Sequence, residues 1–213
     1  MTGARGKLIT LEGGEGAGKS TLLQRLRAHL SEAGVEVLQT REPGGTALGE
    51  VVRALVLDAK QHGMCAESEA LLMFAARAQH VREVLEPALA AGRWVLCDRY
   101  TDASYAYQGG GRGVDVHAIA QLEAIATEGL KPDLTLLLDL AVAHGRARAS
   151  GRSAADRIER EEDAFFERVR ATYLARAAAE PQRFRVLDAS QSADEVLAAA
   201  VAALDSLRSS ASA

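Results

Sequence analysis

The 213-residue sequence contains no asparagine and only two cysteines. GTPases that recognise guanine with an Asn-Lys-x-Asp element need asparagine, so its absence argues against that class. Cys65 and Cys97 lie far apart, outside any Cys-x-x-Cys or Cys/His grouping, which suggests neither a disulfide framework nor a zinc site. We therefore expect a protein of a reducing compartment.

Excess positive charge is also missing. Lysine and arginine number 25 against 29 acidic residues, for a formal net charge of −4. Neutralising many phosphates needs clustered basic residues, so no nucleic-acid partner is expected, whereas a small anionic substrate needs only a few local arginines. No apolar run is long enough to span a membrane, and residues 1–6 lead directly into an expected strand. We expect no signal peptide, no membrane partner and a cytoplasmic protein.

Hydrophobic patterning predicts strands that alternate with helices. We interpret residues 1–213 as one α/β domain, a three-layer αβα sandwich with a five-stranded parallel sheet. The segment over 101–113 is expected to close in a glycine-rich bend, and residues 150–162 to form a charged, irregular insert. The helix over 67–92 is expected to bend near Pro87. The strands are predicted over 7–12, 35–39, 93–97, 134–138 and 184–187, and the helices over 20–33, 46–57, 67–92, 115–128, 141–149, 163–180 and 192–207.

The strongest motif is a phosphate loop between the first strand and the first helix. It fits the pattern G-x-x-x-x-G-K-[ST] with strand and helix in the right places. Glycines let backbone N–H groups turn toward phosphate oxygens, and the helix N-terminus adds partial positive charge. Lys19 is expected to reach the β- and γ-phosphates, and the Ser20 hydroxyl to ligate Mg²⁺. The motif consists of Gly13, Gly14, Glu15, Gly16, Ala17, Gly18, Lys19, Ser20 and Thr21.

The positions of the arginines indicate which of the reactions of a phosphate-loop protein to expect. Phosphoryl transfer between two anions depends on positioning and on cancelling charge, so several arginines should converge. Arg41 follows the second strand, Arg53 lies on the next helix and Arg99 follows the third strand. A second group surrounds the insert after the fourth strand, as in a lid: Arg146, Arg148, Arg152, Arg157 and Arg160. The pattern favours transfer to a small acceptor.

The order of the motifs resembles bacterial thymidylate kinases over nearly the whole chain. The resemblance implies transfer of the γ-phosphoryl group of ATP to dTMP, with Mg²⁺, giving ADP and dTDP for dTTP synthesis. It also implies a P-loop nucleoside-monophosphate-kinase fold with a mobile lid, and a homodimer. The motifs are Glu12 to Thr21, Thr40 to Thr46, Phe74 to His80, Asp98 to Tyr100, Ser104 with Tyr107 to Gly109, Pro132-Asp133 and Asp156 to Glu159.

At the phosphate end, the resemblance implies that Asp98 helps to hold Mg²⁺ and that Glu42 reaches the metal through water. It places Arg41, Arg53 and Arg99 near the phosphate that receives the transfer. A surface charge is the alternative for Arg41 and Arg53, and for Arg53 the two readings are about equal. Pro43 is expected to follow a cis peptide bond.

At the nucleoside end, the resemblance implies that Glu15 accepts a hydrogen bond from the sugar 3′-hydroxyl. Arg77 is expected to read the O4 carbonyl of thymine, with Ser104 and Gln108 at the base edge. Tyr107 is expected to crowd the 2′ position. Ordinary packing is the alternative for the last four residues.

The stacking residue departs from the family pattern. An aromatic residue is usual four positions before the arginine, but here that position is Met73 and Phe74 lies three before. Both spacings share a helix face with Arg77. Phe74 is our candidate for stacking on thymine; the alternatives are that Met73 covers the base and that Phe74 belongs to the core.

The lid resembles the family type in which a small residue in the loop is compensated by basic residues in the lid. Gly16 and Ala17 occupy the loop, and Arg152 and Arg157 lie in the lid. Closure would then supply charge to the transition state and exclude water. Two other hypotheses remain at this point: a kinase for another nucleoside monophosphate or deoxynucleoside, and a non-enzymatic regulator that binds ATP.

Overall fold

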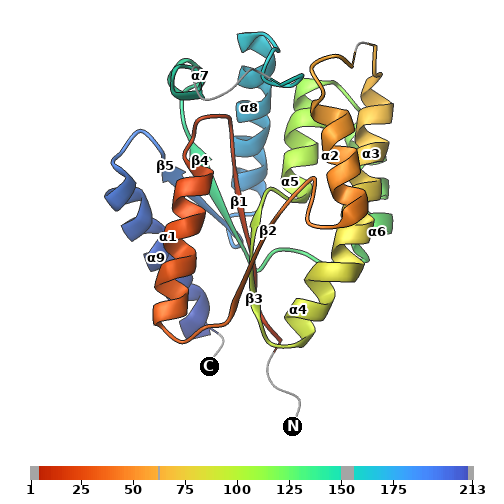
Figure 1. Ribbon diagram of the computed structural model, residues 1–213. Coiled ribbons are helices and arrows are strands. Elements are labelled where there is room, and N and C mark those ends of the chain that lie inside the picture. Colours follow the sequence, from red (N-terminus) through yellow and green to blue (C-terminus); the bar gives the residue numbers. More distant parts are fainter. Residues whose placement is uncertain (1–4, 62, 150–155, 211–213) are drawn as a thin grey trace.

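The computed structural model describes residues 5–61, 63–149 and 156–210, with side chains up to residue 207. The predicted five-stranded parallel α/β sheet is confirmed, with strand order β2-β3-β1-β4-β5 (Figure 1). The apolar segments pair side by side in the middle of the sheet, which is why β1 and β4 are buried almost throughout. The strands are β1 (Leu8–Gly13), β2 (Val37–Arg41), β3 (Trp94–Asp98), β4 (Leu134–Asp139) and β5 (Phe184–Asp188).

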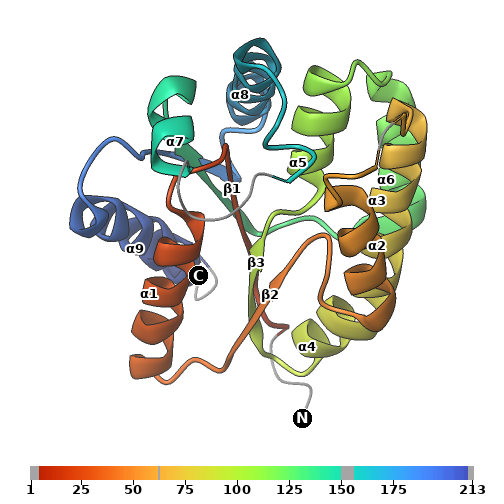
Figure 2. The ribbon, with the colours of Figure 1, turned by 45° about the horizontal axis from the view of Figure 1, so that its top comes forward.

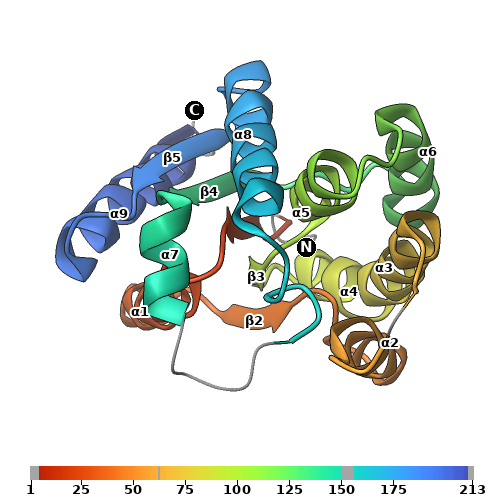
Figure 3. The ribbon, with the colours of Figure 1, turned by 90° about the horizontal axis from the view of Figure 1, so that it is seen from above.

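Helices cover both faces of the sheet, as the view from above shows (Figure 3). The leucine stripe of α1 and the alanine-rich face of α9 pack on one face. The other face is covered by α5, by α8 and by the helical stretch of α3, η1 and α4 that follows α2. The helices are α1 (Lys19–Glu32), α2 (Ala47–Leu57), α3 (Ala66–His80), α4 (Glu86–Ala90), α5 (Thr101–Ser104), α6 (Val116–Thr127), α7 (Val142–Ala149), α8 (Asp163–Ala179) and α9 (Ala193–Ser210), with π-helical segments η1 (Val81–Leu85) and η2 (Tyr105–Gly111).

The expected long helix over 67–92 is built from α3, η1 and α4 in succession. Pro87 has no N–H and its ring crowds the carbonyl four residues earlier, so the regular hydrogen-bond pattern cannot run through it. The chain widens into the π-helical turn η1 just before it. Helix α2 begins as its sequence suggests, because Thr46 Oγ1 accepts a hydrogen bond of 2.9 Å from Gly49 N.

Most of the segment over 101–113 is helical, as α5 and η2, and the chain turns only at Arg112 and Gly113, where φ of Gly113 is 81°. Gly109, Gly110 and Gly111, expected in the bend, lie within η2. Its glycines allow close packing instead. A Cβ atom at Gly110 would lie 2.0 Å from Thr172 Oγ1, and one at Gly111 would lie 2.4 Å from a ring carbon of Phe165. The glycines therefore let η2 pack closely against α8. This contact positions Tyr107 and Gln108 in the candidate active site.

Parallel pairing gathers the functional residues at one edge of the sheet. Arg41 at the end of β2 is the register partner of Asp98 at the end of β3, and β1 ends at Gly13 between β3 and β4. The tilted view in Figure 2 shows this edge between α7, α8 and α5. None of the described helices has both the length and the apolar character needed to cross a bilayer.

Helix α7 lies directly on the phosphate loop. A Cβ atom added to Gly145 would lie 2.4 Å from the carbonyl oxygen of Glu15, and one added to Gly16 would lie 2.1 Å from that of Gly145. Gly16 also has φ of 71°, in the left-handed region that favours glycine. Two backbones thus touch with no side chain between them.

Gly145→Ala should therefore destabilise the fold. Overpacking costs about 1–3 kcal/mol, and the better helix propensity of alanine offsets about 1 kcal/mol of it. We expect a melting temperature lower by a few degrees and weaker ATP binding, measured by calorimetry with and without ATP. Ala143→Ser, at an exposed position of α7, is the control. Wild-type stability and ATP binding in the glycine variant would contradict the contact.

Candidate active site

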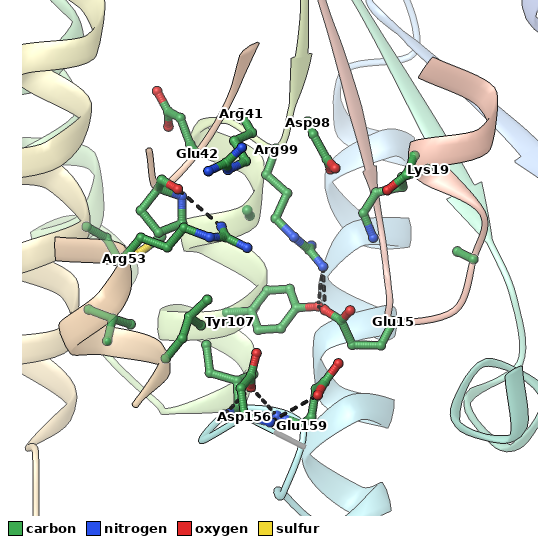
Figure 4. A pocket seen from close by; sticks show the side chains of 18 of the residues that line it. Glu15, Lys19, Arg41, Glu42, Arg53, Asp98, Arg99, Tyr107, Asp156 and Glu159 are labelled. Carbon is green, nitrogen blue, oxygen red and sulfur yellow. Dashed lines mark hydrogen bonds and ion pairs between the residues drawn. The ribbon is translucent and has the colours of Figure 1, made fainter. Parts of the chain in front are cut away.

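The candidate site is a cavity of about 280 Å³ at the carboxyl edge of the sheet. Its walls come from the phosphate loop, the ends of β2 and β3, helices α2 and α3, segment η2 and the turn before α8 (Figure 4). Of the predicted residues, those with side chains or backbone in its lining are Glu15, Gly16, Ala17, Gly18, Lys19, Ser20, Thr21, Arg41, Glu42, Arg53, Asp98, Arg99, Tyr107 and Gln108.

The phosphate loop has the backbone that its glycines predict. Gly18, with φ of 93°, caps α1, whose N-terminus opens on the cavity. Lys19 Nζ donates to the carbonyl oxygens of Gly13 at 3.0 Å and Gly14 at 2.8 Å. Burial and the nearby charge of Arg99 lower the pKa of Lys19. Because loop carbonyls rather than carboxylates hold the ammonium group, its charge is available to an anion in the loop.

Arg99 is the most constrained residue of the site. Its φ of 70° puts a non-glycine residue in the left-handed region, which costs roughly 1–2 kcal/mol. Nη1 donates to Gly13 O at 2.9 Å and to Tyr173 Oη at 3.2 Å. Nη2 donates to Glu15 Oε1 at 2.6 Å and to Tyr107 Oη at 3.0 Å. The surroundings thus fix both the backbone and the guanidinium of Arg99.

Glu15 is ionised and pairs directly with Arg99, at 2.6 Å, in the cavity (Figure 4). Burial acts to raise the pKa of Glu15, but the charges of Arg99 and Lys19 outweigh it and lower the pKa to about 2. Tyr107 Oη also donates to Glu15 Oε1, at 3.1 Å. Both donors reach Oε1, so Oε2 can accept a hydrogen bond from a ligand hydroxyl.

Two further arginines make the upper part of the cavity electropositive. Arg53 is half-buried, its Nη1 donates to Pro43 O at 3.2 Å, and burial with the charge of Arg41 lowers its pKa. Arg41 pairs with Glu50 at 2.8 Å, with both side chains about half exposed. An exposed pair of this kind holds its partners weakly, so Arg41 can turn to a ligand phosphate.

Asp98 and Ser20 offer oxygen ligands to a cation. Asp98 Oδ1 is buried and has no hydrogen-bond partner in the part of the chain that the structure describes. The Ser20 hydroxyl is exposed at the start of α1, in the same cavity. A lone buried carboxylate oxygen beside a hydroxyl fits a hard cation such as Mg²⁺ that keeps several of its waters. Within the described ranges no cluster of three or more His, Cys, Asp or Glu residues suits a metal.

Both carboxylate oxygens of Glu42 are engaged by α3, which does not support its expected contact with that cation through water. Its Oε2 accepts from Arg77 Nε at 2.7 Å, and its Oε1 accepts from His80 Nδ1 at 2.8 Å. The carboxylate is 3% exposed and points away from Asp98 in Figure 4. Arg77 and His80 on α3 thus hold the carboxylate at the cavity wall. The peptide bond between Glu42 and Pro43 is cis, as predicted.

Arg77 lies behind the cavity wall rather than in it. Its three nitrogens donate to Glu42 Oε2, to Ser104 Oγ at 3.0 Å and to Tyr100 O at 2.9 Å. A guanidinium has five N–H groups, so two remain for a ligand. Its reading of the base stays a prediction.

Phe74 does not line the cavity, which corrects our first candidate for stacking. Its ring packs under the Arg77 guanidinium, 4.6 Å away, in a core cluster with Tyr105 and Ile119. Met73 lines the cavity instead. Of the three possibilities that the spacing allowed, the structure favours Met73 over the base and Phe74 in the core.

Gln108 is the best placed of the predicted base readers. It lines the cavity, its Nε2 donates to Glu69 Oε1 at 2.8 Å, and its Oε1 has no partner in the described ranges. Ser104 is fully buried, and its Oγ accepts a hydrogen bond from Arg77 Nη1.

The two arginines predicted in the lid, Arg152 and Arg157, have to be described separately. Arg152 lies outside the described residues. Arg157 was expected to supply charge to the transition state on lid closure. Here its Nε donates to Val56 O at 2.7 Å and its Nη2 pairs with Glu69 at 2.5 Å. In this arrangement Arg157 anchors the lid and does not line the cavity, and its role on closure stays a prediction. Asp156 and Glu159 at the cavity edge cap one another's backbone N–H groups.

Sequence reasoning missed the role of Glu12. This fully buried carboxylate accepts from Tyr100 N at 2.7 Å through Oε1 and from Tyr173 Oη at 2.7 Å through Oε2. Tyr173 in turn accepts from Arg99. Burial, with the charge of Asp102, raises the pKa of Glu12 to about 7. An acidic residue inside an otherwise apolar strand was the available signal.

Comparisons with known proteins agree on one family. A sequence profile described as thymidylate kinase matches residues 11–200. The thymidylate kinase of Ectopseudomonas mendocina (strain ymp) is 56% identical over 202 residues, which cover 95% of this chain and 96% of that protein. That of Nitrosospira multiformis is 54% identical over 192 residues, covering 90% and 93%. A solved thymidylate kinase from Ehrlichia chaffeensis superposes with a TM-score of 0.77 at 33% identity, covering 94% of this chain and 99% of that one.

The pKa of Glu12 predicts a pH-dependent stability. Because the pKa is raised on folding, the folded chain binds more protons than the unfolded chain between about pH 4.5 and 7. The free energy of unfolding should fall over that interval as pH rises, by up to roughly 3 kcal/mol from this group. In Glu12→Gln this contribution should vanish, which urea unfolding at pH 5, 6, 7 and 8 would measure. Glu32→Gln, at an exposed end of α1, is the control, and parallel profiles for wild type and Glu12→Gln would refute the assignment.

Proposed function

The chain belongs to the thymidylate kinase family and phosphorylates dTMP to dTDP with ATP, and we propose that the cavity above is where the transfer takes place. One observation carries the proposal: Arg99 links the phosphate-loop carbonyl of Gly13 to Glu15 at the point where donor and acceptor must meet. The product dTDP serves dTTP synthesis.

The phosphate end works by positioning and charge. The loop N–H groups and Lys19 bind the β- and γ-phosphates, and Arg99 with Arg41 and Arg53 binds the phosphate of dTMP. As the γ-phosphoryl group moves, charge spreads over its oxygens, and fixed cations stabilise it without reorganising. The constrained conformation of Arg99 supports this role, since strain at a functional residue persists where the surroundings over-determine it.

We propose that Ser20 and Asp98 hold the Mg²⁺ that accompanies ATP. The unpartnered Asp98 Oδ1 supports this assignment. When bound, such an ion neutralises charge on the β- and γ-phosphates. Glu42 is left out of the metal site, because Arg77 and His80 occupy its oxygens.

The nucleoside end recognises sugar and base separately. Glu15 accepts a hydrogen bond from the 3′-hydroxyl, and its negative charge repels a 3′-phosphate. Tyr107, whose hydroxyl is held by Glu15 and Arg99, crowds the 2′ position. Gln108 and Arg77 read the base edge, with Met73 against the base face.

The lid role of Arg152 rests on the resemblance alone. We propose that closure brings Arg152 to the phosphates while Arg157 remains anchored to Glu69. A water-excluding lid would keep ATP hydrolysis slow until dTMP is bound.

A homodimer is supported by one apolar surface. Helices α2, α3 and α6 lie side by side at one end of the molecule (Figure 3). Exposed apolar side chains on neighbouring helices favour an interface there. Its exposed members are Leu48, Val51, Leu55, Leu71, Val116 and Ile125. We also propose a cytoplasmic location, which the two free thiols of Cys65 and Cys97 support.

A substrate panel tests the function. Purified protein with ATP and Mg²⁺ is given dTMP, dUMP, dCMP, dGMP, thymidine or no acceptor, and ADP production is followed. We expect strong preference for dTMP and a near-silent control without acceptor. Preference for another acceptor would discard the base reading by Gln108 and Arg77. ADP formation without acceptor would discard the lid argument, and ATP binding without ADP formation would indicate a regulator.

A charge placed on the apolar surface tests the dimer. Val51→Glu should shift the protein from dimer to monomer in light scattering after gel filtration, because a two-fold interface would bury both copies of the added charge. Val186→Glu, at another exposed valine, on β5, should leave the dimer intact. A wild-type monomer, or dissociation by both variants, would refute the assigned face.

A further inference from the structure

Glu69 on α3 is a buried carboxylate that touches both the cavity wall and the chain before α8. Its side chain is 1% exposed. Oε1 accepts from Gln108 Nε2 at 2.8 Å. Oε2 pairs with Arg112 Nε at 3.2 Å and with Arg157 Nη2 at 2.5 Å.

The carboxylate determines which way the Gln108 amide points. An amide can be turned by 180°, which exchanges a donor with an acceptor at nearly the same position. A carboxylate between two guanidinium groups has only acceptors to offer, so Gln108 must present its NH₂ group to Glu69. The opposite orientation would set a carbonyl oxygen against Glu69 Oε1. The Gln108 carbonyl oxygen is therefore left on the other side, where it has no donor among the described residues.

We propose that Glu69 is a positioning residue for pyrimidine recognition, which orients Gln108 so that its carbonyl accepts a hydrogen bond from the base. The inference rests on the proposed function, in which Gln108 reads the base edge. Thymine carries a hydrogen on N3, whereas N3 of cytosine is an acceptor. A fixed carbonyl thus satisfies thymine and repels cytosine, and rejection by an acceptor facing an acceptor is the kind of negative selection that specific sites use.

Arg112 and Arg157 take part in the same arrangement, because both pair with Glu69. Arg112 lies next to Gln108 beyond η2, and Arg157 belongs to the turn that closes the cavity, so each neutralises Glu69 from a different segment. Without them the buried charge would be costly, and a protonated carboxyl could donate to Gln108 as well as accept. The ion pair of Arg157 with Glu69 thus contributes to the orientation of Gln108.

The test compares catalytic efficiency, kcat/KM, for dTMP and dCMP in wild type, Glu69→Gln and Gln108→Leu. A glutamine at 69 can donate or accept, so both orientations of Gln108 become possible. We expect the dTMP/dCMP ratio to fall about tenfold in Glu69→Gln, chiefly through better use of dCMP. In Gln108→Leu the ratio should fall through poorer use of dTMP. Adding Glu69→Gln to Gln108→Leu should change the ratio no further.

The outcomes separate the two proposals. A lowered ratio in Gln108→Leu with an unchanged ratio in folded Glu69→Gln would overturn the role of Glu69 and leave the proposed function standing. An unchanged ratio in Gln108→Leu would overturn the base reading, and the inference with it. Equal losses for both substrates in Glu69→Gln would indicate a purely structural carboxylate.

Controls address charge and folding. Glu161→Gln removes the other partner of Arg112, 2.5 Å from its Nη1, without touching Gln108, and should keep the wild-type ratio. Melting curves check that each variant is folded. Should Glu69→Gln fail to fold because two arginines lose their partner, the double variant Glu69→Gln, Arg112→Gln restores the charge balance. It should show the same lowered ratio, and a wild-type ratio in it would overturn the proposal.

Discussion

The position of the Arg99 guanidinium depends on four contacts from three separate parts of the chain. The phosphate loop supplies Gly13 O and Glu15, η2 supplies Tyr107, and α8 supplies Tyr173. Behind them Glu12 accepts hydrogen bonds from Tyr100 N and from the Tyr173 hydroxyl. The backbone just after Arg99 is therefore fixed as well. The left-handed conformation of Arg99 is tolerated because all of these contacts hold it at once. Catalysis by positioning needs this rigidity, since the charge must already be in place when the phosphoryl group moves.

The chain supplies that rigidity with buried charges in addition to its apolar core. Asp102 is fully buried and pairs with Arg176 at 2.5 Å and Arg183 at 2.7 Å, which ties α5 to α8 and to the start of β5. Glu42 does the same for β2 and α3 through Arg77. Buried ion pairs add little net stability, because desolvation offsets the attraction. Their directional hydrogen bonds hold the loops at the sheet edge in one arrangement, which apolar contacts alone would leave freer.

The sequence predicted best what depends on local structure. The phosphate loop follows from its own glycines and from the strand and helix on either side of it, and the parallel sheet follows from alternating apolar segments. It failed where the answer depends on distant parts of the chain. Whether Met73 or Phe74 faces the ligand depends on how α3 is rotated against α6 and η2, and both spacings fit one helix face. The long side chain of Arg157 can reach Glu69 or a phosphate, and only the folded lid shows which. The glycines after Gln108 suggested a bend, because the close approach of α8 that requires them lies more than fifty residues away in sequence.

Specificity in this fold comes from two layers of side chains. The residues that would touch dTMP, such as Gln108 and Arg99, are supported by buried carboxylates beneath them: Glu69 bonds Gln108 directly, and Glu12 acts on Arg99 through Tyr100 N and the Tyr173 hydroxyl. A flexible amide or guanidinium could adapt to the wrong nucleotide, whereas one whose donors and acceptors are already assigned cannot do so without losing a buried hydrogen bond. The inner layer cannot be recognised from motifs, because its partners lie 35 to 161 residues apart in the chain. It follows that chains with identical ligand-contacting residues can still differ in substrate selection when the carboxylates beneath those residues differ.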